Sequence, residues 1–311
     1  MRDRIYLVGF LLGAGLLLYL GRDLLEKSTL VTWSLTFAGT TAAGVLGLTL
    51  YRVQLELRAS RHELARKEAE LNFALEVQQA LFPRRFPTDA GLEFAGLCVP
   101  ARGISGDYYD VLRLPDGRLV FTIADISGKG ISAAILMSNL HAVARTLAGA
   151  GSSPEEVCSR LNRHLYEVTS GERFATFFYA EWQRADRSLR YVNAGHNAPL
   201  LLTSLGGSRL DAGAPPLGIF PDTEFKEKRV SLQPGDLLVL YSDGVTEARN
   251  EREIEFGESR LEALAAARRE APLADIQQQV LKAVRHWAGE EVEDDMTLLV
   301  VRASGPGQEA V

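Results

Sequence analysis

The sequence has few of the residues that most often build soft-metal or thiol sites. It contains 2 cysteines and 5 histidines in 311 residues. Cys98 and Cys158 stand in apolar stretches without a CxxC or Cys/His spacing, so we expect small buried residues in a reducing compartment. Nothing in their placement indicates a cysteine-based metal site or a disulfide framework.

A surplus of positive charge is also missing. The formal net charge is -6, and no cluster of lysine and arginine carries interleaved aromatic residues. Surfaces that bind nucleic acid need concentrated positive charge. We therefore expect no nucleic-acid partner.

Charged residues are absent from two stretches near the N-terminus. Residues 5–20 are uncharged and apolar, and residues 30–51 form a second run broken only by threonine, serine and glycine. Each run approaches the roughly 20 residues that cross a bilayer as a helix. A second span, rather than a cleavage site, follows the first, which argues against a signal peptide. Residues 1–51 are predicted to be a two-helix transmembrane anchor.

Positive residues near these runs predict the orientation. Arg2 and Arg4 precede the first run, several basic residues beginning with Arg52 follow the second, and only Arg22 and Lys27 lie between. Because lysine and arginine favour the cytoplasmic side, both ends should be cytoplasmic. The expected location is the inner membrane of the cell, as a multi-pass protein with its N-terminus and the domain that follows the second run in the cytoplasm.

Glycine and proline are absent from residues 52–81, which favours one continuous linker helix. Leucines repeat at heptad spacing, but Ser60 and Lys67 are poor core residues in the other row. The pattern predicts a weak homodimer through a coiled-coil-like linker, with a solvated spacer as the alternative. Pro83 and Pro87 then end the helix.

Residues 82–303 change to short strands separated by turns, with helices between and after them. We predict strands at 92–99, 118–124, 175–182, 189–193, 200–203, 237–241 and 296–301, and helices at 131–148, 153–169, 258–269 and 274–288. This order predicts an α+β domain whose helices cover the outer faces of packed sheets. Residues 304–311 are predicted to be a disordered tail.

Aspartates recur where a predicted strand gives way to glycine or begins. Asp107, Asp125 and Asp243 each lie beside or near a glycine, and Asp294 and Asp295 precede the last strand. A single Asp-Gly pair usually marks only a turn. Several carboxylates together, without cysteine or histidine, are hard oxygen ligands that suit Mg²⁺ or Mn²⁺.

Six ordered motifs carry a family resemblance over residues 81–302. They are PARGISGDYYD, ADISGKG, NAGHNAPLLL, PPLGI, LYSDGVTEARN and DDMTLLVV. In this order they resemble the SpoIIE/RsbU branch of the PPM metal-dependent serine/threonine phosphatases. The resemblance implies a PPM-type β-sandwich flanked by helices (α-β-β-α), here preceded by two transmembrane helices and the helical linker.

The resemblance also implies a site for two divalent cations, Mn²⁺ or Mg²⁺. Asp125 would bridge them, the backbone carbonyl of Ile126 and Asp107 would serve the first, and Asp243 and Asp294 would bind the second. Asp295 is expected to orient Asp294 or cap its turn. Asp110 is expected to contact one of the metal-binding residues without binding the metal itself.

Three further polar residues have two interpretations each. Arg102 either neutralises the substrate phosphate or is a solvated loop residue. His196 is either a general acid or a turn histidine satisfied by backbone. His141 and His164 fall in predicted helices, where a structural role is the simpler interpretation.

The function implied is hydrolysis of phosphoserine or phosphothreonine on a bacterial signalling protein. Members of this branch commonly act on STAS-domain anti-sigma-factor antagonists in partner-switching pathways. The alternatives are a non-catalytic membrane scaffold that sequesters such a partner, and a hydrolase of small phosphate esters. The linker helix is further expected to move the 124–130 loop and so change cation occupancy.

Overall fold

The computed structural model describes residues 13–16, 19, 29–87, 91–101, 103–289 and 293–305. Its contacts divide the chain into two units, residues 1–69 and residues 70–311. Helix α3 (Thr29–Gln79) begins in the first unit and ends in the second. Most of the first predicted span, residues 5–20, lies outside the described residues.

Helix α3 joins the second predicted span and the predicted linker in one element. Its N-terminal part is long and apolar enough to cross a membrane by length and composition. Leu30, Trp33 and Phe37 are each at least 75% exposed there. Helix α4 (Ile131–Gly149) meets the same compositional test, but its side chains Met137 and Leu140 are buried in the core of the second unit.

Two antiparallel sheets form the second unit in the described part of the chain. The first has the order β1 (Leu92–Val99), β10 (Met296–Ala303), β9 (Leu237–Tyr241), β6 (Leu200–Thr203), β7 (Gly206–Arg209). The second has the order β2 (Tyr108–Arg113), β3 (Leu119–Ile126), β4 (Ala175–Gln183), β5 (Ser188–Ala194), β8 (Lys228–Ser231). Phe121, Phe178, Leu240 and Leu299 belong to the core cluster that the two sheets share.

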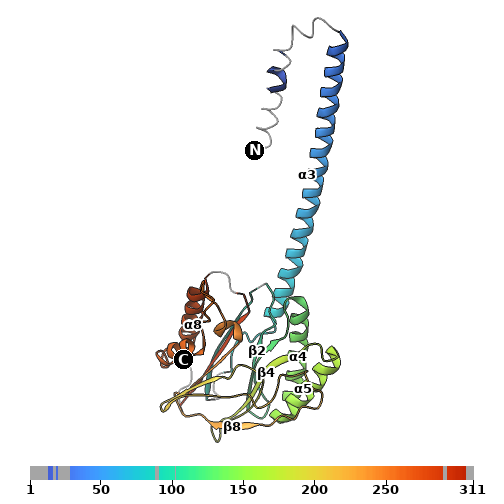
Figure 1. The fold of residues 1–311 in the computed structure, drawn as a ribbon. Helices are drawn as coiled ribbons and strands as arrows, with labels where there is room; N and C mark the ends of the chain where they lie inside the picture. The colour runs from blue at the N-terminus through green and yellow to red at the C-terminus, as the bar shows by residue number, and fades with distance from the viewer. Residues whose placement is uncertain are drawn as a thin grey trace. The chain divides into compact units, whose positions relative to one another are not determined.

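Helices cover the outer face of each sheet. Helices α4 and α5 (Pro154–Thr169) share a buried cluster with β3 and β4, and α7 (Glu258–Ala266) and α8 (Leu273–Ala288) share another with β9 and β10. Figure 1 shows α8 on one side of the sandwich and α4 and α5 on the other. The predicted α-β-β-α arrangement is confirmed. Burial of both faces explains why β9 is apolar throughout.

Most predicted elements appear within one or two residues of their expected bounds. The strands at 92–99, 200–203 and 237–241 are confirmed at both ends. Helix α5 begins as expected, because the Ser153 side chain accepts a hydrogen bond from the Glu156 N–H. The predicted helix at 258–269 was too long, since α7 ends at Ala266. Strands β2, β7 and β8 and the short helix α6 (Asp243–Thr246) were missed.

Candidate functional site

The strand register brings acids from both sheets to one edge of the sandwich. Asp107 immediately precedes β2, and the pairing of Tyr108 with Ala124 sets it beside Asp125 near the end of β3. In the other sheet, Asp243 follows β9 and Asp294 lies two residues before β10. A hydrogen bond of 3.0 Å from the Ser242 N–H to the Thr297 carbonyl joins these two strand ends.

The pKa shifts show that the carboxylates act on one another. Burial, and then the charge of Asp125, raise the pKa of Asp107 well above its usual range. Burial, followed by the charges of Asp243 and Asp294, raises the pKa of Asp125 to about 7. The pKa of Asp243 is raised by burial and then by Asp294. Like charges gathered at one edge without a cation produce shifts of this direction.

The donor chemistry fits a hard divalent cation. Oxygen atoms make up the predicted ligand set, and the buried Oδ2 of Asp107 has no hydrogen-bond partner. Within the described ranges, no three histidine, cysteine or acidic side chains stand close enough to hold one ion. Both oxygens of Asp294 are engaged, Oδ2 by Lys129 Nζ at 2.8 Å and Oδ1 by the Asp295 N–H at 3.0 Å. The chemistry of an all-oxygen set suits Mg²⁺ or Mn²⁺, but Asp294 would have to release a partner and the acids would have to draw closer to hold an ion.

Glycine beside the acids permits close approach of backbone. A Cβ on Gly244 would collide with the carbonyl oxygen of Asp295, so the turn carrying Asp243 packs directly on the segment carrying Asp294. A Cβ on Gly106 would lie 3.1 Å from the carbonyl oxygen of Ile126, the predicted backbone ligand. A side chain at Gly244 would push these two segments apart, and one at Gly106 would require a small shift of the Ile126 carbonyl.

Asp295 holds the loop that carries Asp107. Its carboxylate accepts hydrogen bonds from the Ala101 N–H at 2.8 Å, the Gly106 N–H at 2.9 Å and the Ser105 hydroxyl at 2.7 Å. Ser105 Oγ in turn accepts from the Asp107 N–H at 2.9 Å. Asp295 therefore clamps one sheet's acid loop to the other sheet, a broader role than the predicted support of Asp294.

The end of α3 joins the same loop through Gln78. This buried side chain donates to the Ser105 carbonyl at 2.7 Å and accepts from the Ser105 N–H at 2.9 Å. Sequence reasoning missed Gln78 and Ser105 as parts of the site. The available signal was that Gln78 follows Leu57, Leu64 and Leu71 at seven-residue spacing. A polar residue in such a row often marks a specific partner.

The remaining expected residues lie elsewhere. Asp110 faces α4, where Arg145 donates to both carboxylate oxygens at 2.6 and 2.9 Å. His164 Nε2 lies 2.7 Å from Asn139 Oδ1, and the His141 ring packs edge-on against Tyr108. Both histidines have the structural surroundings expected of them. Arg102 lies outside the described residues.

His196 is buried in the turn after β5. The backbone N–H of His196 donates to Asn193 Oδ1 at 2.8 Å, and the ring Nδ1 lies 2.8 Å from the Thr176 hydroxyl. Burial lowers the pKa of His196 to about 3, so its ring is neutral at ordinary pH. This environment supports the turn histidine rather than the general acid.

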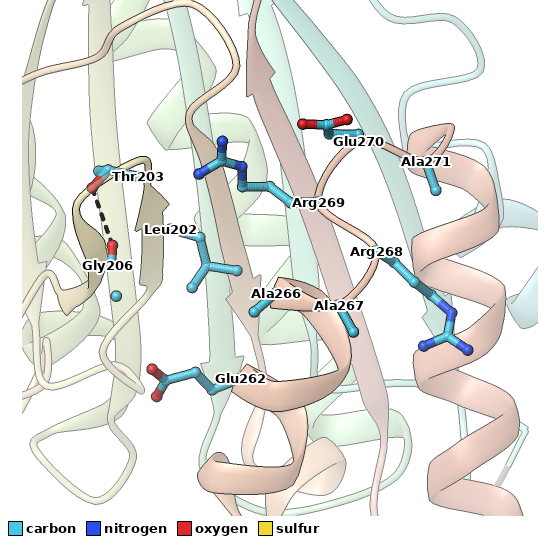
Figure 2. Close-up of a pocket in the computed structure, with 11 residues that line it drawn as sticks. Leu202, Thr203, Gly206, Glu262, Ala266, Ala267, Arg268, Arg269, Glu270 and Ala271 are labelled. Carbon is cyan, nitrogen blue, oxygen red and sulfur yellow. Dashed lines mark hydrogen bonds between the residues drawn. The ribbon is translucent and has the colours of Figure 1, made fainter.

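Two surface depressions flank the first sheet. A groove of about 350 Å³ is lined by Lys129, Asp243, Glu247, Arg249 and Asp294, among others, and so opens onto the acid cluster. A larger pocket of about 560 Å³ lies at the β6–β7 hairpin and the turn between α7 and α8 (Figure 2). Its lining, which includes Leu202, Glu262 and Arg269, contains none of the predicted site residues. The smaller groove is therefore the candidate substrate site.

Residues 115–304 match the family described as Stage II sporulation protein E (SpoIIE). The chain belongs to the SpoIIE family. Across 254 residues it is 30% identical to the phosphoserine phosphatase RsbU of Bacillus subtilis, covering 81% of this chain and 74% of RsbU. It is also 30% identical over 204 residues to the phosphoserine phosphatase RsbP of the same organism, covering 63% of this chain and 49% of RsbP.

Solved structures agree with this membership. The RsbU and RsbW domains of Rv1364c from Mycobacterium tuberculosis align with a TM-score of 0.61 and 29% identity, over 71% of this chain and 63% of that one. The SiaA-PP2C domain of Pseudomonas aeruginosa aligns with a TM-score of 0.68 and 20% identity, over 77% and 98%. The SpoIIE-family chain thus has a PP2C-type fold, and its relatives place it among the protein serine phosphatases.

Proposed function

We propose that this chain hydrolyses phosphoserine or phosphothreonine on a partner protein with the help of two divalent cations, Mn²⁺ or Mg²⁺. The observation that carries the proposal is the convergence of Asp107, Asp125, Asp243 and Asp294 from two sheets, where burial and a neighbouring acid raise the pKa of each of the first three. An acid cluster of this kind costs stability, and a bound cation offsets that cost. RsbX, a structure of the same fold at 15% identity, was solved in complex with magnesium.

The proposed residue roles are those that the family resemblance implies. Asp125 would hold both cations, with Asp107 and the Ile126 carbonyl on one side and Asp243 and Asp294 on the other. Bound cations would supply an activated water near neutral pH and screen the phosphate oxygens. The protein itself contributes the rigid strand ends, the Asp295 clamp and the groove that admits the phosphorylated side chain.

The substrate class is proposed from the relatives. RsbU and RsbP are named phosphoserine phosphatases, and Rv1364c joins an RsbU domain to an RsbW domain. A phosphorylated STAS-domain antagonist of an anti-sigma factor is therefore the proposed partner, in a partner-switching pathway of a bacterium.

The proposed location is the inner membrane, with the catalytic domain in the cytoplasm. Residues 1–51 would form the two-helix anchor, residues 52–81 a linker through which two copies pair, and residues 82–303 the phosphatase domain. The exposed apolar side chains in the first half of α3 support membrane contact.

The test is phosphate release from a phosphorylated STAS protein by the full chain in lipid nanodiscs. We expect release with Mn²⁺ and none with a chelator, and an Asp243→Asn variant should lose at least about a hundredfold in kcat. Asp222→Asn, which changes an acid with an 86% exposed side chain, is the matched control and should match the wild type. Tight binding of the phosphoprotein without release under any cation would favour the scaffold instead.

A further inference from the structure

Lys129 lies at the rim of the acid cluster. Its Nζ is 2.8 Å from Asp294 Oδ2 and 3.2 Å from the Glu293 carbonyl oxygen. Its side chain is about half exposed and lines the groove beside Asp243. The residue stands between Gly128 and Gly130, both with positive φ, in the loop that runs from the end of β3 to α4. Lys129 was not singled out by the sequence.

The ion pair occupies an atom that the proposed function needs. The Asp295 N–H already engages Asp294 Oδ1, so Oδ2 is the oxygen open to exchange. A lysine ammonium and a divalent cation compete for such an oxygen, because each neutralises the same charge. When a cation binds Asp294, Lys129 has to withdraw from it.

The withdrawn ammonium would remain at the rim of a groove that is lined mainly by acids. The charged lining residues besides Lys129 and Arg249 are Asp243, Glu247, Glu251, Glu253, Glu293 and Asp294. Among the described residues that line the groove, Arg249 is the other base, and it pairs with Glu255 at 3.0 Å and with Glu253 at 3.5 Å. A phosphate dianion that reaches the cations passes this rim. Lysine suits such a ligand as a mobile point charge.

We propose that Lys129 changes partners during the reaction, from Asp294 to the phosphoryl group of the substrate. In the cation-free protein it restrains Asp294, and in the loaded enzyme it positions the phosphate over the acid cluster. This inference rests on the proposed function and deepens it by naming a phosphate-binding residue.

The experiment compares Lys129→Met, Lys129→Arg and wild type as full chains in nanodiscs. Titration calorimetry measures the affinity for Mn²⁺, and then the affinity of the Mn²⁺-loaded protein for inorganic phosphate. For Lys129→Met we expect Mn²⁺ to bind roughly two- to fivefold more tightly, the size expected for losing a half-exposed ion pair. Phosphate should bind at least about tenfold more weakly. Lys129→Arg should recover most of the phosphate affinity.

The control is Lys226→Met, which removes the same charge from an exposed lysine that does not line the groove. It should bind both ligands as the wild type does. If Lys129→Met also matches the wild type in both titrations, the partner exchange is wrong while the proposed function stands. If the wild type itself binds no Mn²⁺ and releases no phosphate, the proposed function fails and this inference falls with it.

Discussion

At the residue scale, Asp125 should destabilise the cation-free protein at neutral pH. Its pKa of about 7 in the folded protein exceeds the value of about 4 in an unfolded chain. The folded state therefore holds the extra proton, and stability falls as pH rises from about 4 through 7. Asp125→Asn should raise the free energy of unfolding by roughly 2–4 kcal/mol at pH 8, or about 5–10 °C in the unfolding midpoint.

Thermal unfolding with a chelator at pH 8 and pH 5 measures this effect. The gain should shrink at pH 5, where Asp125 is already protonated in the folded state. Asp222→Asn supplies the exposed comparison and should shift neither midpoint. A gain of equal size at both pH values would show that the effect comes from packing rather than from charge.

His196 gives a second prediction at this scale. Because burial lowers its pKa to about 3, the ring is neutral near pH 7 and lacks the imidazolium proton that a general acid would transfer. His196→Gln should lower stability by about 1–3 kcal/mol, since the partly buried Thr176 hydroxyl loses the buried His196 ring as its partner. The pH dependence of kcat/KM for a phosphoprotein should keep its shape. Loss of one limb of that profile would instead identify His196 as a general acid or base.

At the scale of elements, strands with an unbroken apolar run were easier to predict from the sequence than polar edge strands. All residues of β9 are buried, so its apolar run and flanking turns fixed both ends. Strand β7 contains two glycines, and β8 is mostly exposed and basic, because each lies at a sheet edge with polar surroundings. Edge strands of this composition lack the alternation on which sequence reasoning depends.

Part of the candidate site could be predicted from the sequence and part could not. Asp107, Asp125 and Asp243 stand in short motifs with glycine, so local sequence indicated them. Local sequence could not indicate the hydrogen bonds by which Asp295 holds the loop before Asp107. Asp295 accepts one of these bonds from Ser105, which is 190 residues away in the chain. Lys129 pairs with Asp294 across a similar separation of 165 residues. Such contacts depend on the sheet register, which residue patterns do not specify.

The end of α3 yields a prediction about this clamp. Gln78→Ala removes both hydrogen bonds to Ser105 and leaves a buried backbone N–H unsatisfied, at a cost of about 1–3 kcal/mol. The loop before Asp107 should loosen, so we expect faster amide exchange over residues 101–107 and weaker Mn²⁺ binding. Hydrogen exchange and calorimetry measure these effects.

The neighbouring Gln79 is exposed and supplies the matched variant, Gln79→Ala. It alters the same helix turn without touching the loop, so exchange and Mn²⁺ affinity should stay at wild-type levels. Equal loosening in both variants would mean that helix propensity, rather than the Ser105 contact, controls the loop.

At the scale of the whole molecule, we expect the second unit to be soluble by itself and the first unit to require a membrane. Residues 70–311 contain three buried apolar clusters and the acid edge, and they retain the Gln78 contact. The first unit contributes exposed apolar side chains such as Trp33 and Phe37. Large exposed apolar surface of this kind indicates contact with lipid or another chain.

We therefore predict that the full chain, expressed in a bacterium, stays in the membrane fraction after an alkaline carbonate wash, whereas residues 70–311 remain in the supernatant. The fragment should unfold cooperatively and bind Mn²⁺ as the full chain does, since its described residues include the predicted acid ligands. Trp33→Glu and Phe37→Glu together place two charges in the apolar stretch, at a cost of several kcal/mol in a bilayer. That double variant should release the full chain from the membrane. A full chain that washes off as readily as the fragment would refute the anchor and make α3 a soluble helix whose apolar face pairs with protein.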